Sequence, residues 1–245
     1  MLTPTTSSFF DSVEDLSTLT GSVVSQPITQ TGENANVVNL CFLGGTMIAT
    51  PGGERLVEDL AIGDMVLTAT GQNVAVKWIG RQRVAPAAVN MTLPEHLSPV
   101  CIEAGTLGNH SGLYVTADHG MIISPSSSEA IGEDLQDMLV VNASGRVNGD
   151  TVRFVPTSEL AAFTCYHIET VAHDVILANG APAETFCDAA GRMAFDNYAE
   201  YPELYGIERI IPEMRAPRIS AQRLLPDAIK ARLGIADTLL AVDAA

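Results

Sequence analysis

Four residues in this sequence are of types that could together move an acyl group from one atom to another. They are, in chain order, Cys41, Thr116, His119 and His173. A cysteine thiolate is a nucleophile, an imidazole takes or gives a proton near neutral pH, and a hydroxyl donates or accepts a hydrogen bond. Single residues of these types are common in any chain, so the question is which elements would bring the four together.

The longest informative stretch starts at the cysteine. It reads CFLGGTMIATPGGERLVEDLAIGDMVLTATG and runs from Cys41 to Gly71. Short β-prone runs follow the cysteine and are separated by glycine pairs, which favour tight turns. The runs are Thr46–Thr50, Arg55–Leu60 and Asp64–Ala69, and the glycine pairs are Gly44-Gly45 and Gly52-Gly53. Cys41 therefore opens a β-rich module.

The threonine and the two histidines lie in two further β-rich stretches. Leu113–Ile123 places Thr116 and His119 three positions apart, at a turn between two apolar strands. Cys165–Gly180 contains two predicted strands that flank a turn, and His173 lies at that turn. Many short strands with frequent turn signals favour an all-β fold over alternating βαβ units.

The first stretch resembles the opening block of the hedgehog/intein (Hint) autoprocessing domains, specifically their bacterial branch. The resemblance rests on Cys-Phe, Gly-Thr-x-Ile-x-Thr-Pro, Gly-Glu-Arg, Val-Glu-Asp-Leu and Gly-Asp-x-Val, in this order. Thr116-x-x-His119 is similar to the Thr-x-x-His block of the family, and His173 with the following Ala-Asn-Gly is similar to its last block. The resemblance implies a horseshoe-shaped, pseudo-two-fold all-β fold and self-processing without a cofactor or a metal.

The resemblance also implies a role for each candidate residue. In the family the first residue attacks the peptide bond on its own N-terminal side, which here is Leu40–Cys41. A planar amide resists attack, so the shift needs a sulfur held against the carbonyl and a proton for the departing nitrogen. Cys41 supplies the sulfur, and His119 is the candidate donor to its amide nitrogen. Thr116 is the candidate hydrogen-bond partner of the strained amide or its carbonyl oxygen, and His173 is an assisting residue.

The end of the resembling region departs from the splicing members of the family. Those carry a His-Asn pair followed by Cys, Ser or Thr, and the asparagine cyclises to release the downstream segment. Here Glu184-Thr185 stand in place of that pair, and Phe186, which cannot cyclise, precedes Cys187. Asn179-Gly180 is typical of a type I′ turn. We therefore expect autocatalytic, single-turnover cleavage of the N-terminal junction without full splicing.

The acidic composition bears on the partners of the protein. Lys+Arg number 13 against 29 Asp+Glu, which gives a formal net charge of −16 and disfavours nucleic acid and anionic membranes as partners. No apolar run approaches the roughly 18 residues of a spanning helix, and no secretory signal is recognisable. We expect a soluble protein whose substrate is its own N-terminal segment, with water, a small thiol or an amine as acyl acceptor. Export without a signal peptide stays open.

The two ends of the chain differ from its centre. Residues 1–40 are too poor in apolar residues for a core of their own and are interpreted as a leader or flanking segment; the alternative is an arm that packs on the domain. Residues 41–197 are the predicted Hint domain, and residues 198–245 a partly helical tail without a functional site. Helices are expected at Pro226–Leu233 and Ala236–Val242.

The remaining cysteines and histidines give weaker indications. The four cysteines stand at positions 41, 101, 165 and 187 without a C-x-x-C pair, so free thiols are expected rather than a zinc ribbon or a disulfide framework. His96, Cys101 and His110 lie near one another in sequence, but their spacing fits no common metal-ligand pattern. His167 and Glu169 alternate on one strand face and are equally compatible with exposure to solvent.

Further elements are expected from local patterns. Strands are predicted at Asn73–Gly80 and Thr151–Val155, whereas residues 85–110 are less regular and contain one apolar run, Val100–Ile102. Hairpin turns are predicted at Ser144-Gly145 and Asn148-Gly149, and a short helix at Thr157–Ala162.

Two other functions remain open. A Hint fold without its chemistry would be a structural or interaction module of a secreted protein, and its chain would stay intact. A Cys-His hydrolase acting in trans would need a substrate pocket, and its rate of cleavage would depend on protein concentration.

Overall fold

The computed structural model describes residues 40–85, 98–124, 138–156, 159, 162–188 and 191–235. Its strands are β1 (Phe42–Leu43), β2 (Met47–Thr50), β3 (Gly53–Leu56), β4 (Met65–Leu67), β5 (Asn73–Ala75), β6 (Trp78–Val84), β7 (Val100–Ile102), β8 (Leu113–Val115), β9 (Gly120–Ile123), β10 (Leu139–Asn142), β11 (Val152–Phe154), β12 (Phe163–Glu169), β13 (Val175–Ala178), β14 (Ala181–Glu184) and β15 (Arg218–Ile219). The helices are short: α1 (Glu200–Tyr205), α2 (Asp227–Arg232) and the 3-10 turns η2 (Val57–Asp59), η6 (Ala143–Arg146), η8 (Arg192–Ala194) and η9 (Gln222–Leu224). The prediction of an all-β fold is confirmed.

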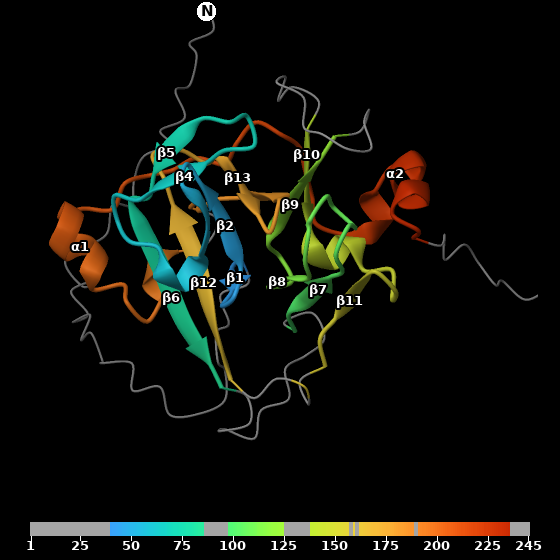
Figure 1. The fold of residues 1–245 in the computed structure, drawn as a ribbon, viewed down its shortest axis with the longest axis horizontal. Helices are drawn as coiled ribbons and strands as arrows, with labels where there is room; N and C mark the ends of the chain where they lie inside the picture. The colour runs from blue at the N-terminus through green and yellow to red at the C-terminus, as the bar shows by residue number, and fades with distance from the viewer. Residues whose placement is uncertain are drawn as a thin grey trace, which may run out of the picture. The chain divides into compact units, whose positions relative to one another are not determined.

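Two sheets carry most of the strands. A six-stranded sheet has the order β11-β7-β8-β1-β12-β6, a seven-stranded sheet has the order β15-β10-β9-β14-β13-β2-β3, and β4 and β5 form a separate pair. The long strands β6 and β12 run side by side over their whole length (Figure 1). The short strand β1 lies between β8 and β12, because Phe42 pairs with Val115 on one side and with Tyr166 on the other. Cys41 therefore lies at the start of a central strand.

The Asn179-Gly180 turn connects β13 and β14 as the sequence predicts. Both residues have positive φ angles, 48° and 86°, which is the backbone of a type I′ turn. The Asn179 side chain accepts the Met47 N–H at 2.7 Å and donates to the Gly112 carbonyl oxygen at 2.9 Å. The turn thus fixes the β13–β14 hairpin against β2 and against the loop that leads into β8.

An aromatic cluster covers one face of β6 with residues from far along the chain. The Trp78 ring meets the rings of Phe195 and Tyr201 edge to face, at centroid distances of 5.4 and 5.5 Å. Gly80 makes this possible, because a Cβ at that position would lie 2.7 Å from a ring carbon of Phe195. The segment after residue 190 is therefore part of the folded core.

The end of the described chain adds a strand and a helix. β15 pairs in parallel with β10, so the tail that was predicted to be partly helical also adds a strand to the seven-stranded sheet. A strand of this length has no periodicity to detect in a sequence. The predicted helix near Pro226–Leu233 is confirmed as α2, and its residue Ile229 belongs to one buried cluster with Ile123, Val141 and Ile219. In Figure 1, α1 and α2 lie on opposite sides of the β strands.

Two predicted elements are wrong in detail. The strand predicted over Arg55–Leu60 ends at Leu56, because Val57–Asp59 forms a 3-10 turn whose Glu58 carboxylate accepts the Gly45 N–H at 2.9 and 3.1 Å. The strand predicted over Asn73–Gly80 is split into β5 and β6.

The hairpin predicted around Ser144-Gly145 is absent. These residues lie in η6, and the flanking strands β10 and β11 belong to different sheets. Most of the helix predicted at Thr157–Ala162, and all of the one at Ala236–Val242, lie outside the described residues. The domain boundaries at 40/41 and 197/198 stay predictions.

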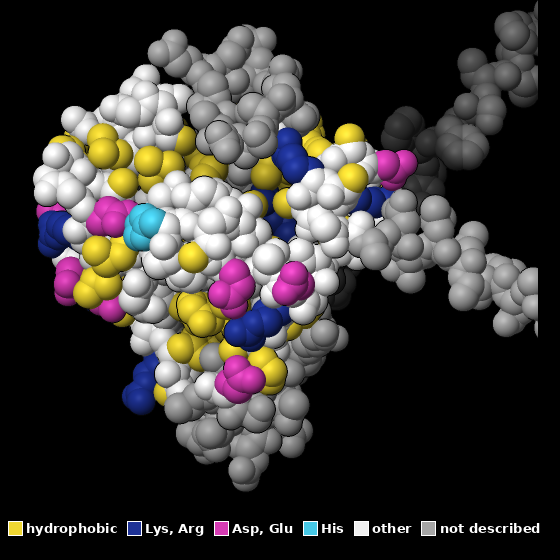
Figure 2. Space-filling view, turned by 45° about the vertical axis from the view of Figure 1, so that its right-hand side comes forward, with side chains coloured by type: hydrophobic (Ala, Val, Ile, Leu, Met, Phe, Trp, Pro, Cys, Tyr) yellow, Lys and Arg dark blue, Asp and Glu magenta, His cyan; other side chains and the backbone are white. Residues whose placement is uncertain are grey.

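The described surface carries charges of both signs. On the face shown in Figure 2, acidic and basic side chains are interspersed among hydrophobic ones and do not gather into a patch of one sign. Within the described ranges, the helices all fall short of the length and apolar character needed to cross a bilayer.

Candidate functional site

The backbone of Cys41 is held by Thr116 from the neighbouring strand. The Cys41 N–H donates to Thr116 Oγ1 at 2.7 Å, and the Thr116 N–H donates to the Cys41 carbonyl oxygen at 2.9 Å. Both residues are fully buried. The pairing of β1 with β8 produces this contact, because it places the turn after β8 beside the residue that precedes β1. The amide nitrogen of the Leu40–Cys41 bond is therefore fixed by the threonine that the sequence singled out.

His119 lies in the same turn, and its ring is enclosed. The imidazole packs at centroid distances of 4.3 Å from Phe42 and 5.8 Å from His167. Burial lowers the pKa of His119, and the nearby Glu184 carboxylate and Leu40 backbone carbonyl oppose this only in part. The imidazole is therefore neutral at neutral pH and carries one N–H and one lone pair.

Neither ring nitrogen of His119 has a hydrogen-bond partner among the described residues. A buried polar group without a partner is costly, so a histidine with a purely structural role would be expected to have one. The Leu40 carbonyl oxygen lies near the ring, but it does not meet the geometry of a hydrogen bond. The geometry leaves the imidazole free to bond to a group that changes its charge or position during a reaction.

The Cys41 thiol is held in its protonated form. Burial and a hydrogen bond with the Cys165 side chain of β12 raise the pKa of Cys41 well above its ordinary value, while the Leu40 backbone lowers it less strongly. A thiolate is the reactive form of cysteine. The resting site therefore contains a nucleophile that must lose its proton as it reacts.

His173 lies outside this group and belongs to a neighbouring one. The Met214 N–H donates to His173 Nδ1 at 2.9 Å, and Nε2 lies 3.0 Å from Glu184 Oε2. Burial lowers the pKa of His173, but bonds with Cys187 and Glu184 outweigh this and raise it. A raised pKa favours the doubly protonated ring, but Nδ1 must offer a lone pair to the Met214 N–H. The geometry therefore allows one ring proton, which we place on Nε2, where it is donated to Glu184.

Glu184 connects the two groups. Its Oε1 accepts the N–H of Gly120, the residue after His119, at 2.6 Å, and Arg218 donates to both of its carboxylate oxygens. Burial raises the pKa of Glu184, but the bonds from His173 and Arg218 outweigh it and hold the pKa well below its usual range. A Cβ on Gly120 would lie 2.4 Å from Oε1, so only glycine fits there.

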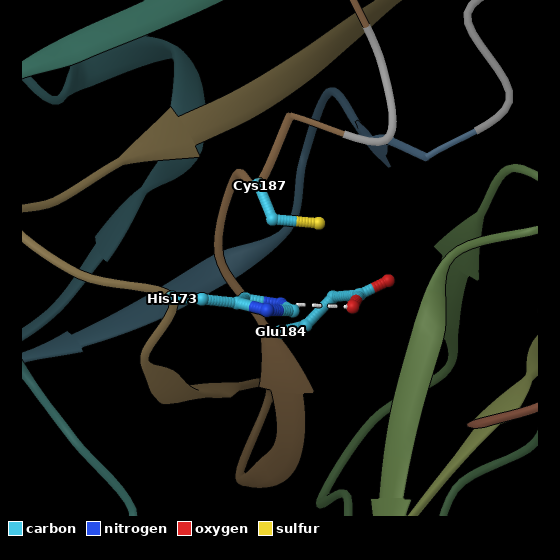
Figure 3. A group of neighbouring side chains, drawn as sticks. All are labelled: His173, Glu184 and Cys187. Carbon is cyan, nitrogen blue, oxygen red and sulfur yellow. Dashed lines mark hydrogen bonds and ion pairs between the residues drawn. The ribbon is translucent and has the colours of Figure 1, made fainter. Parts of the chain in front are cut away.

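His173, Glu184 and Cys187 form the one group among the described residues whose ligand atoms could surround a metal ion, within 4.8 Å of one another (Figure 3). Histidine, carboxylate and thiolate are ligands that zinc accepts. However, both oxygens of Glu184 already accept bonds from Arg218. A metal on Nε2 would also require a proton on Nδ1, toward which the Met214 N–H points. The arrangement fits a hydrogen-bonded ion pair better than a set of metal ligands.

His167 and Glu169 are buried rather than exposed to solvent. Each is 1% exposed, and Glu169 forms an ion pair with Arg192 at 2.8 Å and accepts the Tyr201 hydroxyl at 3.1 Å. Arg192 and Tyr201 come from the segment after residue 190, which the sequence did not place against β12. Of the other histidines, His110 bonds to Glu54 at an exposed position, and His96 lies outside the described residues.

The structure thus brings together three of the four predicted residues, namely Cys41, Thr116 and His119, and places His173 beyond Glu184. Two participants were missed. Cys165 was treated as an ordinary free thiol, and Arg218 lies in a tail that offered no recognisable motif. All four cysteines are free and buried.

Fold and site together define a class of protein: an all-β domain with a buried cysteine directly before β1 and a Thr-x-x-His turn whose threonine bonds to the amide nitrogen of that cysteine. Residues 40–190 match the family model of the Hint domain. The chain therefore belongs to the Hint domain family.

Several solved inteins are similar to this chain. The MchDnaB-1 intein has a TM-score of 0.37 at 16% identity over 58% of this chain and 98% of its own. A bacterial intein-like domain from Clostridium thermocellum has a TM-score of 0.37 at 13% identity, over 60% of this chain and 99% of its own. The gp41-1 intein has a TM-score of 0.35 at 12% identity, over 58% and 96%. No curated protein matches the chain. The family assignment rests on the Hint match.

Proposed function

We propose that this Hint domain cleaves its own chain at Leu40–Cys41 by an N-to-S acyl shift, without splicing. The observation that carries the proposal is the 2.7 Å hydrogen bond from the Cys41 N–H to Thr116 Oγ1, beside the buried and unpartnered imidazole of His119. The amide of the Leu40–Cys41 bond thus lies beside Thr116 and His119, whose side chains can support an acyl transfer.

The step balances without any other reactant. The Cys41 sulfur attacks the Leu40 carbonyl carbon, a C–S bond forms, and the C–N bond breaks. The thiol proton ends on the nitrogen, which leaves as the free amine of Cys41, and Leu40 becomes a thioester. Neutral His119 donates its N–H to the carbonyl oxygen as negative charge develops there, and Thr116 holds the nitrogen.

This division of roles differs from the one expected from the sequence for His119, but not for Thr116. His119 was assigned to the amide nitrogen, and Thr116 to the amide or its carbonyl oxygen. In the resting geometry Thr116 contacts the nitrogen, and the Leu40 carbonyl is the group near His119. His173 acts only through Glu184 in this scheme. The thioester is then resolved by water, a small thiol or an amine, and no cofactor is needed.

The rate of cleavage should rise with pH. Because the pKa of Cys41 is raised well above its ordinary value by burial, its thiolate fraction grows about tenfold per pH unit over the range from roughly pH 7 to 9. With hydroxylamine in excess to trap the thioester, the logarithm of the first-order rate constant should increase linearly over this range. A plateau beginning near pH 7 would instead mean that the site stabilises the thiolate.

The products should keep the C-terminal segment attached. Glu184-Thr185 carry no side-chain amide, so the cyclisation that releases the downstream segment in splicing has no nucleophile there. Incubation with thiol should yield a fragment ending at Leu40 and one from Cys41 to Ala245. A fragment that begins at Phe186 or Cys187, or a ligated product joining Leu40 to it, would contradict cleavage without splicing.

The enclosure of Cys41 favours a non-catalytic module as the second candidate function. Cys41 is fully buried and its thiol is held protonated, as in an ordinary core cysteine. An intact mass after long incubation with thiol would support this module. The same burial disfavours a hydrolase acting in trans. A cavity of about 1000 Å³ is lined by His173, Thr70 and Arg215 among others, and Cys41 does not line it.

A further inference from the structure

The turn that carries His119 is fixed on both sides by side chains from other strands. The Gly120 N–H donates to Glu184 Oε1 at 2.6 Å, and Asn142 Nδ2 donates to Asp118 Oδ1 at 3.1 Å. Asp118, before His119, is thus bonded to a side chain at the end of β10, and Gly120, after it, is bonded to a side chain of β14. The backbone of His119 is in turn bonded to Thr116 and Ala143.

Both of these side chains are bonded to one arginine. Arg218 Nη1 lies 3.2 Å from Glu184 Oε1 and 3.2 Å from Asn142 Oδ1, and Nη2 donates to Glu184 Oε2. A guanidinium is planar and offers several donors in a fixed arrangement, so it can hold a carboxylate and an amide at a set separation. The Glu184 side chain is 2% exposed, and without Arg218 it would be a buried carboxylate with His173 as its remaining side-chain partner.

Arg218 reaches this place because β15 pairs with β10. Arg218 lies opposite Val140, and the Val140 N–H donates to the Pro217 carbonyl oxygen at 2.9 Å. The strand lies outside residues 40–190, which the Hint family model matches. The part of the chain that the family shares therefore does not contain this arginine.

We propose that Arg218 is a positioning residue for His119, which it holds against the Leu40–Cys41 amide by bridging Glu184 and Asn142. The inference rests on the proposed cleavage. Arg218 touches neither the scissile bond nor the imidazole through any described hydrogen bond, so its effect is transmitted through the turn.

The first test measures first-order cleavage in hydroxylamine. Arg218→Met should slow cleavage roughly 10- to 100-fold, the range expected when a reacting group is displaced by about 1 Å. Arg218→Lys keeps the charge but has its donors on a single nitrogen and cannot hold two partners at the separation set by a guanidinium, so it should restore part of the rate. Arg223→Met, which removes an exposed arginine of the same segment, should cleave at the wild-type rate. Wild-type cleavage by Arg218→Met would overturn the proposal.

A double-mutant cycle tests the route through Glu184. Glu184→Gln keeps an acceptor for the Gly120 N–H but removes the charge that Arg218 binds. If Arg218 acts through Glu184, Arg218→Met should slow cleavage much less in the Glu184→Gln background than in the wild type. An equal loss of rate in both backgrounds would refute this route, as would near-UV circular dichroism showing that the variants lose rate only by unfolding. Should Arg218→Met itself not fold, Arg218→Lys replaces it in the cycle.

A readout independent of cleavage separates this inference from the proposed function. In Cys41→Ala chains, nuclear magnetic resonance of the labelled imidazole follows the pKa of His119. The charged or titratable groups around that ring are Glu184, Arg218, His173 and His167. Arg218→Met should raise the pKa of His119, because the positive charge of Arg218 no longer balances the Glu184 carboxylate. Glu184→Gln should lower the pKa of His119, because it removes that negative charge. A wild-type chain that never cleaves would refute the proposed function alone. His119 signals unchanged by Arg218→Met would refute the inference.

Discussion

Replacing Cys41 with alanine should abolish cleavage at Leu40–Cys41 altogether. The N-to-S acyl shift needs a sulfur that becomes bonded to the Leu40 carbonyl carbon, and alanine has no nucleophilic side chain to replace it. Hydroxylamine or dithiothreitol should accelerate the wild-type reaction, because each intercepts a thioester, and neither should have an effect on the variant. Mass spectrometry of the intact chain over time provides the measurement.

A second cysteine serves as the control for this result. Cys101 is also buried, lies in β7 and bonds to Glu103, away from the Leu40–Cys41 amide. Cys101→Ala should therefore cleave at nearly the wild-type rate. Persistent cleavage in Cys41→Ala would show that another residue, or a contaminating protease, breaks the bond.

The next largest effect is expected at His119. His119→Ala should slow cleavage by roughly 10² to 10⁴, the range typical for a group that transfers or shares a proton in a transition state. Since neither imidazole nitrogen is bonded to a described residue, the variant leaves no polar group unpaired, and the cost in folding is that of a cavity. Thr116→Val should slow cleavage less, although the buried Cys41 N–H then loses its acceptor, at about 1–3 kcal/mol of stability.

The exposed His110 offers a matched comparison for His119. It is bonded to Glu54 at the surface, so His110→Ala should change neither the rate of cleavage nor the thermal unfolding of the chain by much. Cleavage at an unchanged rate in folded His119→Ala would remove the histidine from the mechanism. Unfolding of both His119→Ala and Thr116→Val would mark the two residues as structural.

Much of the fold around the site followed from local patterns. The glycine pairs and the Asn179-Gly180 turn are short-range features, and they predicted the limits of β2 and the turn between β13 and β14. Ser144-Gly145 was mistaken for a hairpin turn, because turn residues indicate a change of direction but not which sheet the next strand joins. Sheet order is set by long-range pairing, which no local window contains.

The site also contains residues that the sequence predicted and residues whose place depends on long-range packing. Cys41, Thr116 and His119 come from two sequence stretches that resemble Hint blocks and follow one another in the order of that family. Antiparallel pairing of β1 with β8 brings the three residues together. The burial of Glu169 depends on Arg192 and Tyr201, which bond to its carboxylate from more than twenty residues further along the chain. Arg218 was unpredictable for the same reason, because a lone arginine in a strand of two residues carries no periodic or motif signal.

The most direct test of the account is the chemical state of Leu40 after reaction. The purified chain should be incubated with excess hydroxylamine, and the released N-terminal fragment should be sequenced by tandem mass spectrometry. Cleavage through a thioester predicts a fragment that ends at Leu40 as a hydroxamate, together with Cys41–Ala245 bearing a free N-terminal cysteine, at a rate independent of protein concentration. An intact chain, or a fragment ending at Leu40 with a plain carboxylate under these conditions, would contradict it.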